Sequence, residues 1–382
     1  MKKIKIAHIL HSVGGVDVSL RLILENSSPS QFENIVIHGI VDTKEGFYDK
    51  NKALVKEYKL PISREIAVIN DLISIVKTYR IIKKENPDLI HSHSAKGGVI
   101  GRIVAILTGI PVVYTPQAFS YLSTDNNFKR TFFLLIEKLL SKGNGTLLAS
   151  SKSELKRAIE EVGFKKENVL LFNNAIRPIN VIDSLSIKKS WPDNYICTVG
   201  RPSYQKNIEF MIRVLYEIKK TTNIHLVLMG VGPVSDNLDS VKNLIKELDM
   251  STDITLLNWT KRTDVFNIIN DAKFYISTAR YEGLPYSIIE SMALGTPCIV
   301  SDCDGNRDLI TNDFNGYLVE ENNTADFTAK CIKLWNEEEI QSVFSKNAKK
   351  SFEQEYNILK KIVNLETIYL KQSNLKYKKS HK

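Results

Sequence analysis

Residues 281–301 read YEGLPYSIIESMALGTPCIVS and carry two carboxylates, Glu282 in a turn and Glu290 eight residues later. The pattern predicts a helix over 285–294, because proline suits the first helical turn and Gly295 is a stop signal. No cation lies three or four residues from Glu290, so the helix itself offers this charge no ion-pair partner. An unpaired buried polar group costs roughly 2–7 kcal/mol, and Glu290 therefore needs a partner from elsewhere.

Outward from this stretch, strand-like apolar runs alternate with helical patterns through almost the whole chain. Such alternation indicates parallel sheets covered by helices, the α/β doubly wound class. The periodicity lapses over 176–194, which predicts a linker between two such domains. We expect strands at 4–10, 35–40, 89–93, 112–115, 146–149 and 169–172 before it, and at 195–199, 225–229, 254–257, 274–277, 297–301 and 317–319 after it.

Length and composition agree with two soluble-type domains. The chain has 382 residues and a net charge of +9, which suggests an anionic partner such as a nucleotide, a nucleic acid or an acidic membrane face. Nucleic acid is not expected, because the sequence has no basic, aromatic-interleaved stripe and no reader motif. The four cysteines lack metal-ligand spacing and are expected to be reduced, as in a cytoplasmic protein. The apolar N-terminal run predicts a first strand rather than a signal peptide, and no stretch is long enough to span a bilayer.

Ligands of doubly wound sheets lie beyond the carboxyl ends of the strands, so the turns after strands are the candidate sites. The first turn, HSVGGV, contains Gly14 and Gly15, which let the backbone approach a phosphate where a helix begins. It lacks the third glycine of a dinucleotide fingerprint, and a simple tight turn is an equally good interpretation.

The turn GRPSYQKN follows the strand at 195–199 and contains Gly200, Arg201 and Lys206. Arginine can fork onto two phosphate oxygens and lysine acts as a point charge, a pair that suits a pyrophosphate. The next strand ends in another glycine-rich turn, LMGVGP, with Gly230 and Gly232. These turns and the two carboxylates of the opening stretch fall on one predicted sheet edge.

On that edge Glu290 could accept hydrogen bonds from a ribose diol, as acidic residues do in other nucleotide sites. Glu282 could reach hydroxyl groups of whatever the pyrophosphate carries. The structural alternative for Glu290 is a carboxylate satisfied by backbone N–H groups or by a distant arginine.

The order GRPSYQKN, LMGVGP and EGLPYSIIESMALGTPCIVSD resembles the retaining GT-B glycosyltransferases of family 4, whose two carboxylates with seven residues between them are matched by Glu282 and Glu290. The GGVD turn and the segment HSHSAKGGVIGRIVAILTGIPVVYTPQAF are similar to enzymes of bacterial capsule, exopolysaccharide and O-antigen assembly. The resemblance implies two Rossmann-like parallel-sheet domains facing across a cleft. It also implies transfer of a sugar with retention from a nucleotide-sugar, by family habit a UDP-sugar, to a lipid-linked saccharide in surface polysaccharide biosynthesis.

The resemblance also implies residue roles. Arg201 and Lys206 would bind the donor diphosphate, Glu290 the ribose and Glu282 the transferred sugar, in a front-face substitution through an oxocarbenium-like state. The protein would then mainly stabilise the charge that develops on the departing diphosphate. The implied catalytic residues are Glu282, Arg201, Lys206 and Gln117, and the implied donor-binding residues are Gly14, Gly15, Gly200, Arg201, Lys206, Gly230, Gly232, Glu282, Gly283, Leu284, Pro285 and Glu290.

One position departs from the family pattern. Many relatives carry a histidine in the segment matching 114–119, where this chain has Gln117. Glutamine can donate and accept hydrogen bonds but cannot become cationic, so we expect it to tune sugar choice rather than transfer protons. His91 and His93, at a predicted strand end, are alternative cleft residues, although such histidines are more often structural.

No metal or other cofactor is expected. Asp302 and Asp304 resemble a D-x-D metal motif, but the flanking residues match the family's turn at this place. With two cations already available, the diphosphate does not need Mg²⁺.

The resemblance divides the chain into an acceptor-side domain at 1–180 and a donor-side domain at 181–355. A C-terminal helix at 356–371 is expected to pack back on the first domain, followed by a disordered basic tail at 372–382.

The segment 127–142 bears on the acceptor. It has many apolar residues with Lys129, Arg130, Lys138 and Lys142 around them. It could lie on an anionic membrane at the inner face of the cell membrane and deliver the enzyme to a lipid-linked acceptor. A core helix with snorkelling lysines is the alternative.

Two further functions remain open. A UDP-sugar epimerase of GT-B-like fold would also bind the donor but would convert it without an acceptor. A noncatalytic sugar-nucleotide-binding subunit is the other reading, and the departure at Gln117 favours it slightly.

Overall fold

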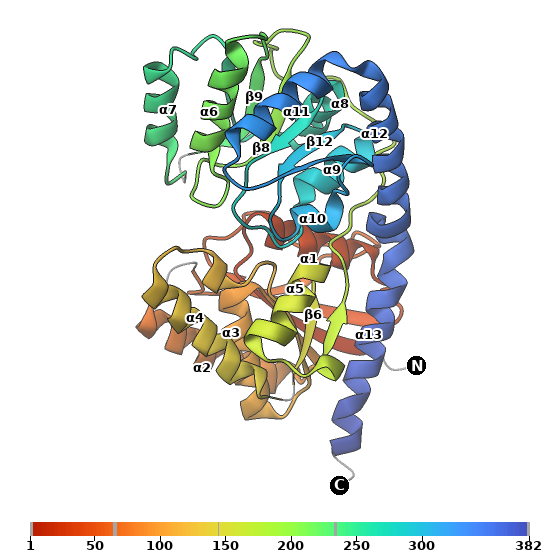
Figure 1. Ribbon diagram of the computed structural model, residues 1–382. Helices are drawn as coiled ribbons and strands as arrows, with labels where there is room; N and C mark the ends of the chain where they lie inside the picture. The colour runs from red at the N-terminus through yellow and green to blue at the C-terminus, as the bar shows by residue number, and fades with distance from the viewer. Residues whose placement is uncertain (1–2, 64–66, 144, 233–234, 380–382) are drawn as a thin grey trace. The chain divides into compact units, whose positions relative to one another are not determined.

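The computed structural model describes residues 3–63, 67–143, 145–232 and 235–379. It divides into two compact units, residues 1–177 with 358–382, and residues 178–357. Each unit is built on one parallel sheet covered by helices (Figure 1). The predicted fold class, two doubly wound α/β domains, is confirmed.

The sheet of the first unit has the strand order β3-β2-β1-β4-β5-β6-β7. The order reverses direction between β1 and β4, which makes their carboxyl ends the topological switch point of this unit. One strand, β3, was not expected, because its sequence KEYKL is a charged edge strand without an apolar run. The strands are β1 (Ile4–Ile9), β2 (Phe32–Gly39), β3 (Lys56–Leu60), β4 (Leu89–His93), β5 (Val112–Thr115), β6 (Thr146–Ala149) and β7 (Val169–Leu171).

Helices cover both faces of this sheet because alternate strand residues point to opposite faces. On one face, Ile9 and Val112 pack against Ile82 of α2 and Ile100 of α3. The opposite face carries α1 and α13. The helices are α1 (Gly15–Asn26), α2 (Val68–Glu85), α3 (Ser94–Thr108), α4 (Asn127–Ser141), α5 (Lys152–Arg157) and α13 (Ile358–Lys379).

The sheet of the second unit has the order β10-β9-β8-β11-β12-β13, so its switch point lies between β8 and β11. All six of its strands fall where the sequence predicted them, within one or two residues. They are β8 (Ile196–Val199), β9 (Leu226–Val231), β10 (Ile254–Asn258), β11 (Tyr275–Ser277), β12 (Cys298–Ser301) and β13 (Gly316–Val319). The helices are α6 (Ile208–Lys219), α7 (Leu238–Glu247), α8 (Arg262–Asp271), α9 (Tyr286–Leu294), α10 (Asn306–Leu309), α11 (Thr324–Asn336) and α12 (Glu338–Ser351).

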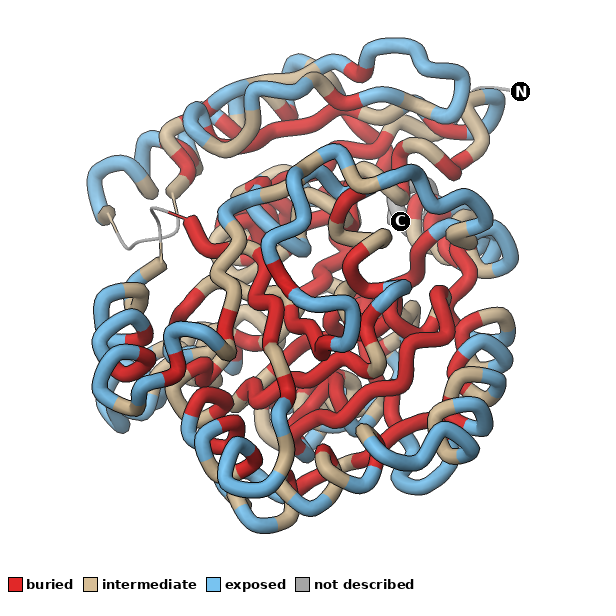
Figure 2. The backbone as a smooth tube through the Cα atoms, turned by 90° about the horizontal axis from the view of Figure 1, so that it is seen from above, coloured by how far each residue is buried: buried red, intermediate tan, exposed pale blue. Residues whose placement is uncertain are grey.

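Burial follows this layering. The strands are buried almost throughout, and exposed positions concentrate on the outer sides of helices and in turns (Figure 2). A hydrophobic core under α6 and α11 supports the second sheet, with Ile212, Leu228 and Phe327 fully buried.

The chain returns to the first unit through α13. The Ile358 N–H donates to Ile176 O at 2.9 Å, and Ile362, Leu365 and Tyr369 join the core beside α1. The unit boundaries therefore lie at 177/178 and 357/358. The expected disordered tail at 372–382 is wrong up to Lys379, because α13 continues and Ser373 extends its buried stripe; residues 380–382 lie outside the described residues.

No helix among the described residues is long and apolar enough to cross a bilayer.

Candidate functional site

The switch point of the second unit brings two predicted site residues together. Lys206, from the loop after β8, places its Nζ 2.6 Å from Oε1 of Glu282, from the loop after β11. The side-chain amide of Gln205 donates to the other oxygen, Oε2, at 3.1 Å. Glu282 is 7% exposed, so the carboxylate is fixed by partners on both oxygens while the lysine remains partly open to solvent.

Lys206 is held as a cation. Burial alone would lower the pKa of Lys206, but the neighbouring Glu282 carboxylate outweighs it and leaves the pKa raised. Gly200 makes room for this side chain, because a Cβ there would stand 3.1 Å from Cγ and Cδ of Lys206.

The glycine turns after β8 and β9 pack against each other. Gly230 has a φ of +91°, which favours glycine, and a Cβ there would lie 3.9 Å from the Arg201 backbone nitrogen. Gly232 lies against Trp259, since a Cβ at Gly232 would approach the indole Nε1 to 2.7 Å. The predicted phosphate turns and the residue after β10 thus form one continuous edge.

Helix α9 follows the EGLP turn. Pro285 occupies the position before the first helical residue, and Gly295 ends the helix at a φ of +81°. The turn is held by close packing. Leu284 is buried, and the carbonyl oxygen of Gly283 lies so close to Gly305 that a Cβ at Gly305 would be 2.8 Å from it. Backbone packing therefore sets the position of Glu282.

Glu290 is buried in α9 and forms an ion pair with Nη2 of Arg262, the first residue of α8. The structural alternative, a distant arginine, is therefore what the structure shows. The local reasoning holds within α9, but the arginine comes from a neighbouring helix 28 residues away. Burial raises the pKa of Glu290, and the Arg262 charge only partly opposes this rise.

Sequence reasoning missed two residues at this edge, Trp259 and Arg262. Both follow β10, whose position was predicted but whose turn, NWTKR, was not considered. Trp259 is 72% exposed beside Gly232. An aromatic residue and cations directly after a predicted strand are the signal that could have found them.

Asp302 and Asp304 both face one guanidinium. Arg307 donates from Nε to Asp302 Oδ1 at 2.6 Å and from Nη1 to Asp304 Oδ1 at 3.0 Å. Both D-x-D carboxylates are therefore already paired with one cation of the chain. That the site needs no metal stays a prediction.

In the first unit, the predicted phosphate turn precedes α1. Gly14 has φ 62° and ψ −132°, a conformation open to glycine, and Gly15 is the first helical residue. The turn is braced by Asp17, which accepts from Ser12 Oγ at 2.7 Å and pairs with Arg21 at 2.8 Å.

Gln117 lies just after β5 in an unusual turn. Gln117 and Ala118 both have positive φ, 54° and 75°, a conformation that costs roughly 1–3 kcal/mol for each residue. Buried Glu154 holds the turn, because its Oε1 accepts from the Ala118 N–H at 2.7 Å and its Oε2 accepts from the Ser150 N–H at 2.7 Å. Among the described residues the Gln117 amide nitrogen has no hydrogen-bond partner.

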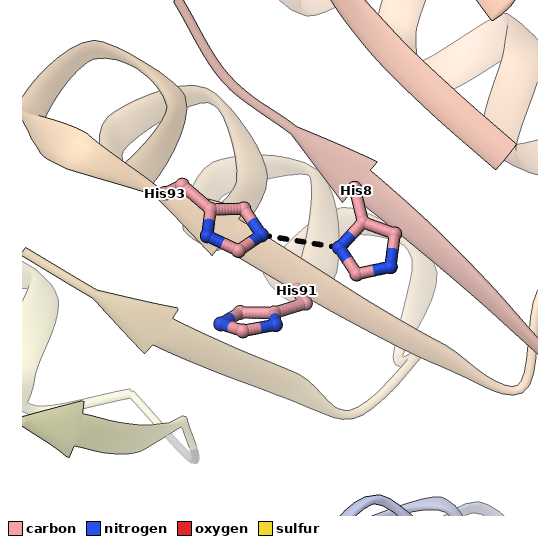
Figure 3. Close-up of side chains that lie close together, drawn as sticks. All are labelled: His8, His91 and His93. Carbon is pink, nitrogen blue, oxygen red and sulfur yellow. Dashed lines mark hydrogen bonds between the residues drawn. The ribbon is translucent and has the colours of Figure 1, made fainter. Parts of the chain in front are cut away.

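His91 and His93 are buried beneath α13 together with His8, which the sequence did not connect to them (Figure 3). His8 Nδ1 and His93 Nε2 share a hydrogen bond of 3.1 Å. His91 bonds Tyr369 Oη at 2.7 Å through Nδ1 and a threonine hydroxyl through Nε2. The three histidines thus connect strands β1, β4 and β5 with α13, which is a structural role.

These imidazoles are near enough to hold a metal ion, with one nitrogen from each within 4.8 Å of the others. However, the rings of His91 and His93 lie over one another, with centroids 3.8 Å apart, and three of the nitrogens bond residues outside the cluster. Burial lowers the pKa of His8 to about 4 and lowers the pKa of His91 and His93 well below the usual value. The cluster is neutral and hydrogen-bonded at neutral pH.

Comparison with known proteins agrees with this geometry. Residues 183–351 match the model of the glycosyl transferases group 1 family, and residues 49–175 match the glycosyl transferase 4-like domain. The chain belongs to these glycosyltransferases. Solved structures with the same architecture are GT-B glycosyltransferases, so the predicted GT-B fold is confirmed.

The glycosyltransferase has relatives along nearly its whole length. It is 27% identical to the UDP-Gal:alpha-D-GlcNAc-diphosphoundecaprenol alpha-1,3-galactosyltransferase of Escherichia coli, over 96% of this chain and 97% of that protein. It is also 27% identical to the capsular polysaccharide biosynthesis glycosyltransferase CapM of Staphylococcus aureus, over 82% and 85%. The crystal structure of Anabaena HepE in complex with UDP and glucose superposes with a TM-score of 0.76 at 17% identity, covering 96% and 99% of the two chains.

Proposed function

We propose that this glycosyltransferase moves a sugar with retention from a UDP-sugar to a lipid-linked saccharide during assembly of a bacterial surface polysaccharide, on the cytoplasmic side of the membrane. The Escherichia coli relative supports this proposal, since its name specifies a UDP-sugar and a diphosphoundecaprenol acceptor. The observation that carries it is the Lys206–Glu282 pair at the switch point of the second sheet.

In this proposal Lys206 and Arg201 bind the donor diphosphate. Negative charge grows on the diphosphate as the sugar leaves, and a preorganised cation stabilises that charge most where water is excluded. Glu282 orients Lys206 through Oε1 and lies where it can meet hydroxyl groups of the transferred sugar. No protein nucleophile is required, because the acceptor attacks the face from which the diphosphate departs.

The nucleoside end would lie along the turns after β9 and β10. A carboxylate has about four acceptor positions, so Glu290 can hold Arg262 and still accept from a ribose diol. The exposed indole of Trp259 offers a stacking surface for the base. Gln117, whose amide nitrogen has no hydrogen-bond partner among the described residues, would tune the choice of sugar through hydrogen bonds.

Donor screening tests the proposal. Thermal shift with UDP-, GDP- and dTDP-sugars should show stabilisation by one UDP-sugar, and that donor should then transfer its sugar to an undecaprenyl-diphosphate saccharide. NMR of the product should show the anomeric configuration of the donor. Conversion of the donor without any acceptor would instead establish an epimerase.

Metal independence is part of the proposal. Two cations at the diphosphate and an internally paired D-x-D predict full transfer in EDTA. Strict dependence on Mn²⁺ or Mg²⁺ would contradict this.

A further inference from the structure

The turn after β5 has a backbone conformation that its own residues do not favour. Gln117 and Ala118 are consecutive and both have a positive φ, of 54° and 75°. Glycine, asparagine and aspartate adopt this region readily, whereas glutamine and alanine are sterically disfavoured in it. The residues on either side, Pro116 and Phe119, are buried, so both ends of the turn are fixed in the core. A contact from elsewhere in the fold must therefore stabilise this conformation.

Glu154 supplies that contact. Ser151 followed three residues later by glutamate is a capping box, in which the glutamate normally bonds the backbone of its own helix. Ser151 does cap α5, because its hydroxyl oxygen accepts from the Glu154 N–H at 3.1 Å. The carboxylate of Glu154, however, serves two segments. Oε2 accepts from Ser150 close by, whereas Oε1 accepts from the Ala118 N–H, 36 residues away in sequence, at 2.7 Å.

The interior position of Glu154 makes these hydrogen bonds important. The residue is 3% exposed, and N–H donors bind an ionised carboxylate more strongly than a neutral oxygen. Burial raises the pKa of Glu154, and the bonds from Ser150 and Ala118 oppose that rise because they stabilise the charged form. The neighbouring Glu137 carboxylate adds to the rise. Removal of one accepting oxygen from Glu154 therefore removes a support of the turn.

The turn carries a side chain that lacks a hydrogen-bond partner. The amide nitrogen of Gln117 is buried, yet it bonds no other group among the described residues. A buried N–H without an acceptor is rare in proteins, because it has lost its hydrogen bonds to water. Gln117 follows the carboxyl end of β5, and ligands of doubly wound sheets bind at such ends. The amide is thus placed to donate to an oxygen of a ligand, and the backbone of the turn sets its direction.

We propose that Glu154 is a positioning residue for sugar recognition. By binding the Ala118 N–H it fixes the left-handed turn, and the turn directs the Gln117 amide toward a hydroxyl oxygen of the sugar. The inference rests on the proposed function, in which Gln117 tunes the choice of sugar. It adds to that function a buried residue that acts on the sugar only through Gln117.

Glu154→Gln tests the positioning. Glutamine has the same length, but it keeps one accepting oxygen and brings an NH₂ group against one of the two backbone N–H donors. Selectivity is measured as the ratio of kcat/KM for the donor found by screening to that for its C4 epimer. Glu154→Gln and Gln117→Ala should each lower this ratio about five- to tenfold, the value of one hydrogen bond. The double variant should be no less selective than Gln117→Ala alone, because both changes remove the same interaction.

A second substitution should restore the turn without the carboxylate. Glycine adopts a positive φ freely, so Ala118→Gly in the Glu154→Gln protein should recover most of the lost selectivity. Ala118→Gly alone should leave selectivity unchanged. Hydrogen exchange measured by mass spectrometry gives a readout that needs no substrate. The Ala118 N–H should exchange at least about tenfold faster in Glu154→Gln than in the unchanged protein.

Glu160→Gln is the matched control, because Glu160 lies on the surface shortly after α5 and pairs there with Lys156 at 3.9 Å. It should change neither selectivity nor exchange. Full selectivity in a Glu154→Gln protein whose Ala118 N–H exchanges faster would overturn the proposal. A loss of selectivity that adds to the loss in Gln117→Ala would overturn it as well.

Glu154→Asp covers the case in which Glu154→Gln does not fold. Aspartate keeps the charge but is shorter by one methylene group, so it cannot reach both N–H donors as glutamate does. It should show the same loss of selectivity and the same faster exchange. Unchanged values of both in Glu154→Asp would contradict the positioning role.

Failure of the proposed function has a different signature. An unchanged protein that binds no nucleotide-sugar and transfers none would contradict the proposed function. Faster exchange of the Ala118 N–H in Glu154→Gln, with unchanged exchange in Glu160→Gln, would still establish that Glu154 positions the turn.

Discussion

The two switch points of this molecule have the same topology and opposite chemistry. Between β8 and β11 the sheet edge carries ionised side chains, with Lys206 partly open to solvent. In β1 and β4 the strands themselves, rather than the loops after them, carry three fully buried neutral histidines. Strand order therefore creates a place for a ligand, but only residues that keep their charge near solvent can use it to bind an anion.

The largest expected effect is the loss of the cation at the charged switch point. Lys206→Ala should reduce transfer by on the order of a hundredfold or more, because the departing diphosphate loses a preorganised positive charge. Arg201→Ala should act in the same direction. Initial rates at saturating donor, with thermal unfolding as a check on the fold, measure this.

Lys220→Ala is the matched control, because Lys220 lies on the surface directly after α6 and pairs there with Glu217. Near-normal turnover in Lys206→Ala would contradict the proposed difference between the two switch points, because the cation at the charged one would then not contribute to catalysis.

Much of this architecture is predictable because parallel strands end at one edge. Lys206 and Glu282 are 76 residues apart, yet the strand pattern alone placed them together. Arg262 escaped because its ion pair joins two helices, whereas only neighbours three or four residues away can be read from sequence. His8 escaped because its partner His93 lies 85 residues away on an adjacent strand.

The exposed apolar residues of α2 and α4 mark a different limit. Helical periodicity shows that apolar residues share a side of a helix, but it does not show which side faces the sheet. The interior positions of Ser74 and Glu137, beside the core residues Ile82 and Phe133, show that both helices carry apolar residues on both sides.

A second prediction concerns the Arg262–Glu290 pair. Arg262→Ala leaves a buried carboxylate unpaired and should destabilise the fold by about 2 kcal/mol. The loss is smaller than for a fully buried pair because the arginine is half exposed. Glu290→Gln should cost less, because the freed guanidinium can hydrate, but should weaken donor binding about tenfold. Denaturant unfolding and donor titration of both variants measure the asymmetry.

The reverse ranking, with Glu290→Gln the less stable protein and unchanged in donor affinity, would show that Glu290 serves the fold alone. Glu290 would then have a purely structural role, as the histidines of the first unit have, and would not bind the donor as Lys206 is proposed to do.

A third prediction tests the neutral switch point. The histidines have folded pKa values below the unfolded value of about 6.5, so the unfolded chain binds more protons at lower pH. Their contribution to stability is present above pH 6.5 and is lost as pH falls toward about 4, by up to about 1.4 kcal/mol per pH unit for each histidine. Denaturant unfolding between pH 7.5 and 5 measures this slope.

His93→Asn should lower the slope even if it lowers stability at every pH, because one titrating group is removed. An unchanged slope would mean that the pKa of His93 is the same in the folded and unfolded chains, so that burial does not keep it neutral. The contrast between the two switch points would then be lost.

The smallest expected effect concerns Trp259 and tests whether the charged edge of the second sheet binds the base of the nucleotide. Trp259→Ala should weaken UDP binding about tenfold, because stacking of a base on an aromatic ring is worth roughly 1–3 kcal/mol, whereas Trp259→Phe should retain most of the affinity. Inorganic pyrophosphate, which has no base, should bind the unchanged protein and Trp259→Ala alike when measured by calorimetry. Equal losses for UDP and pyrophosphate would mean that the indole only supports the turn at Gly232, and that base recognition lies elsewhere on this edge.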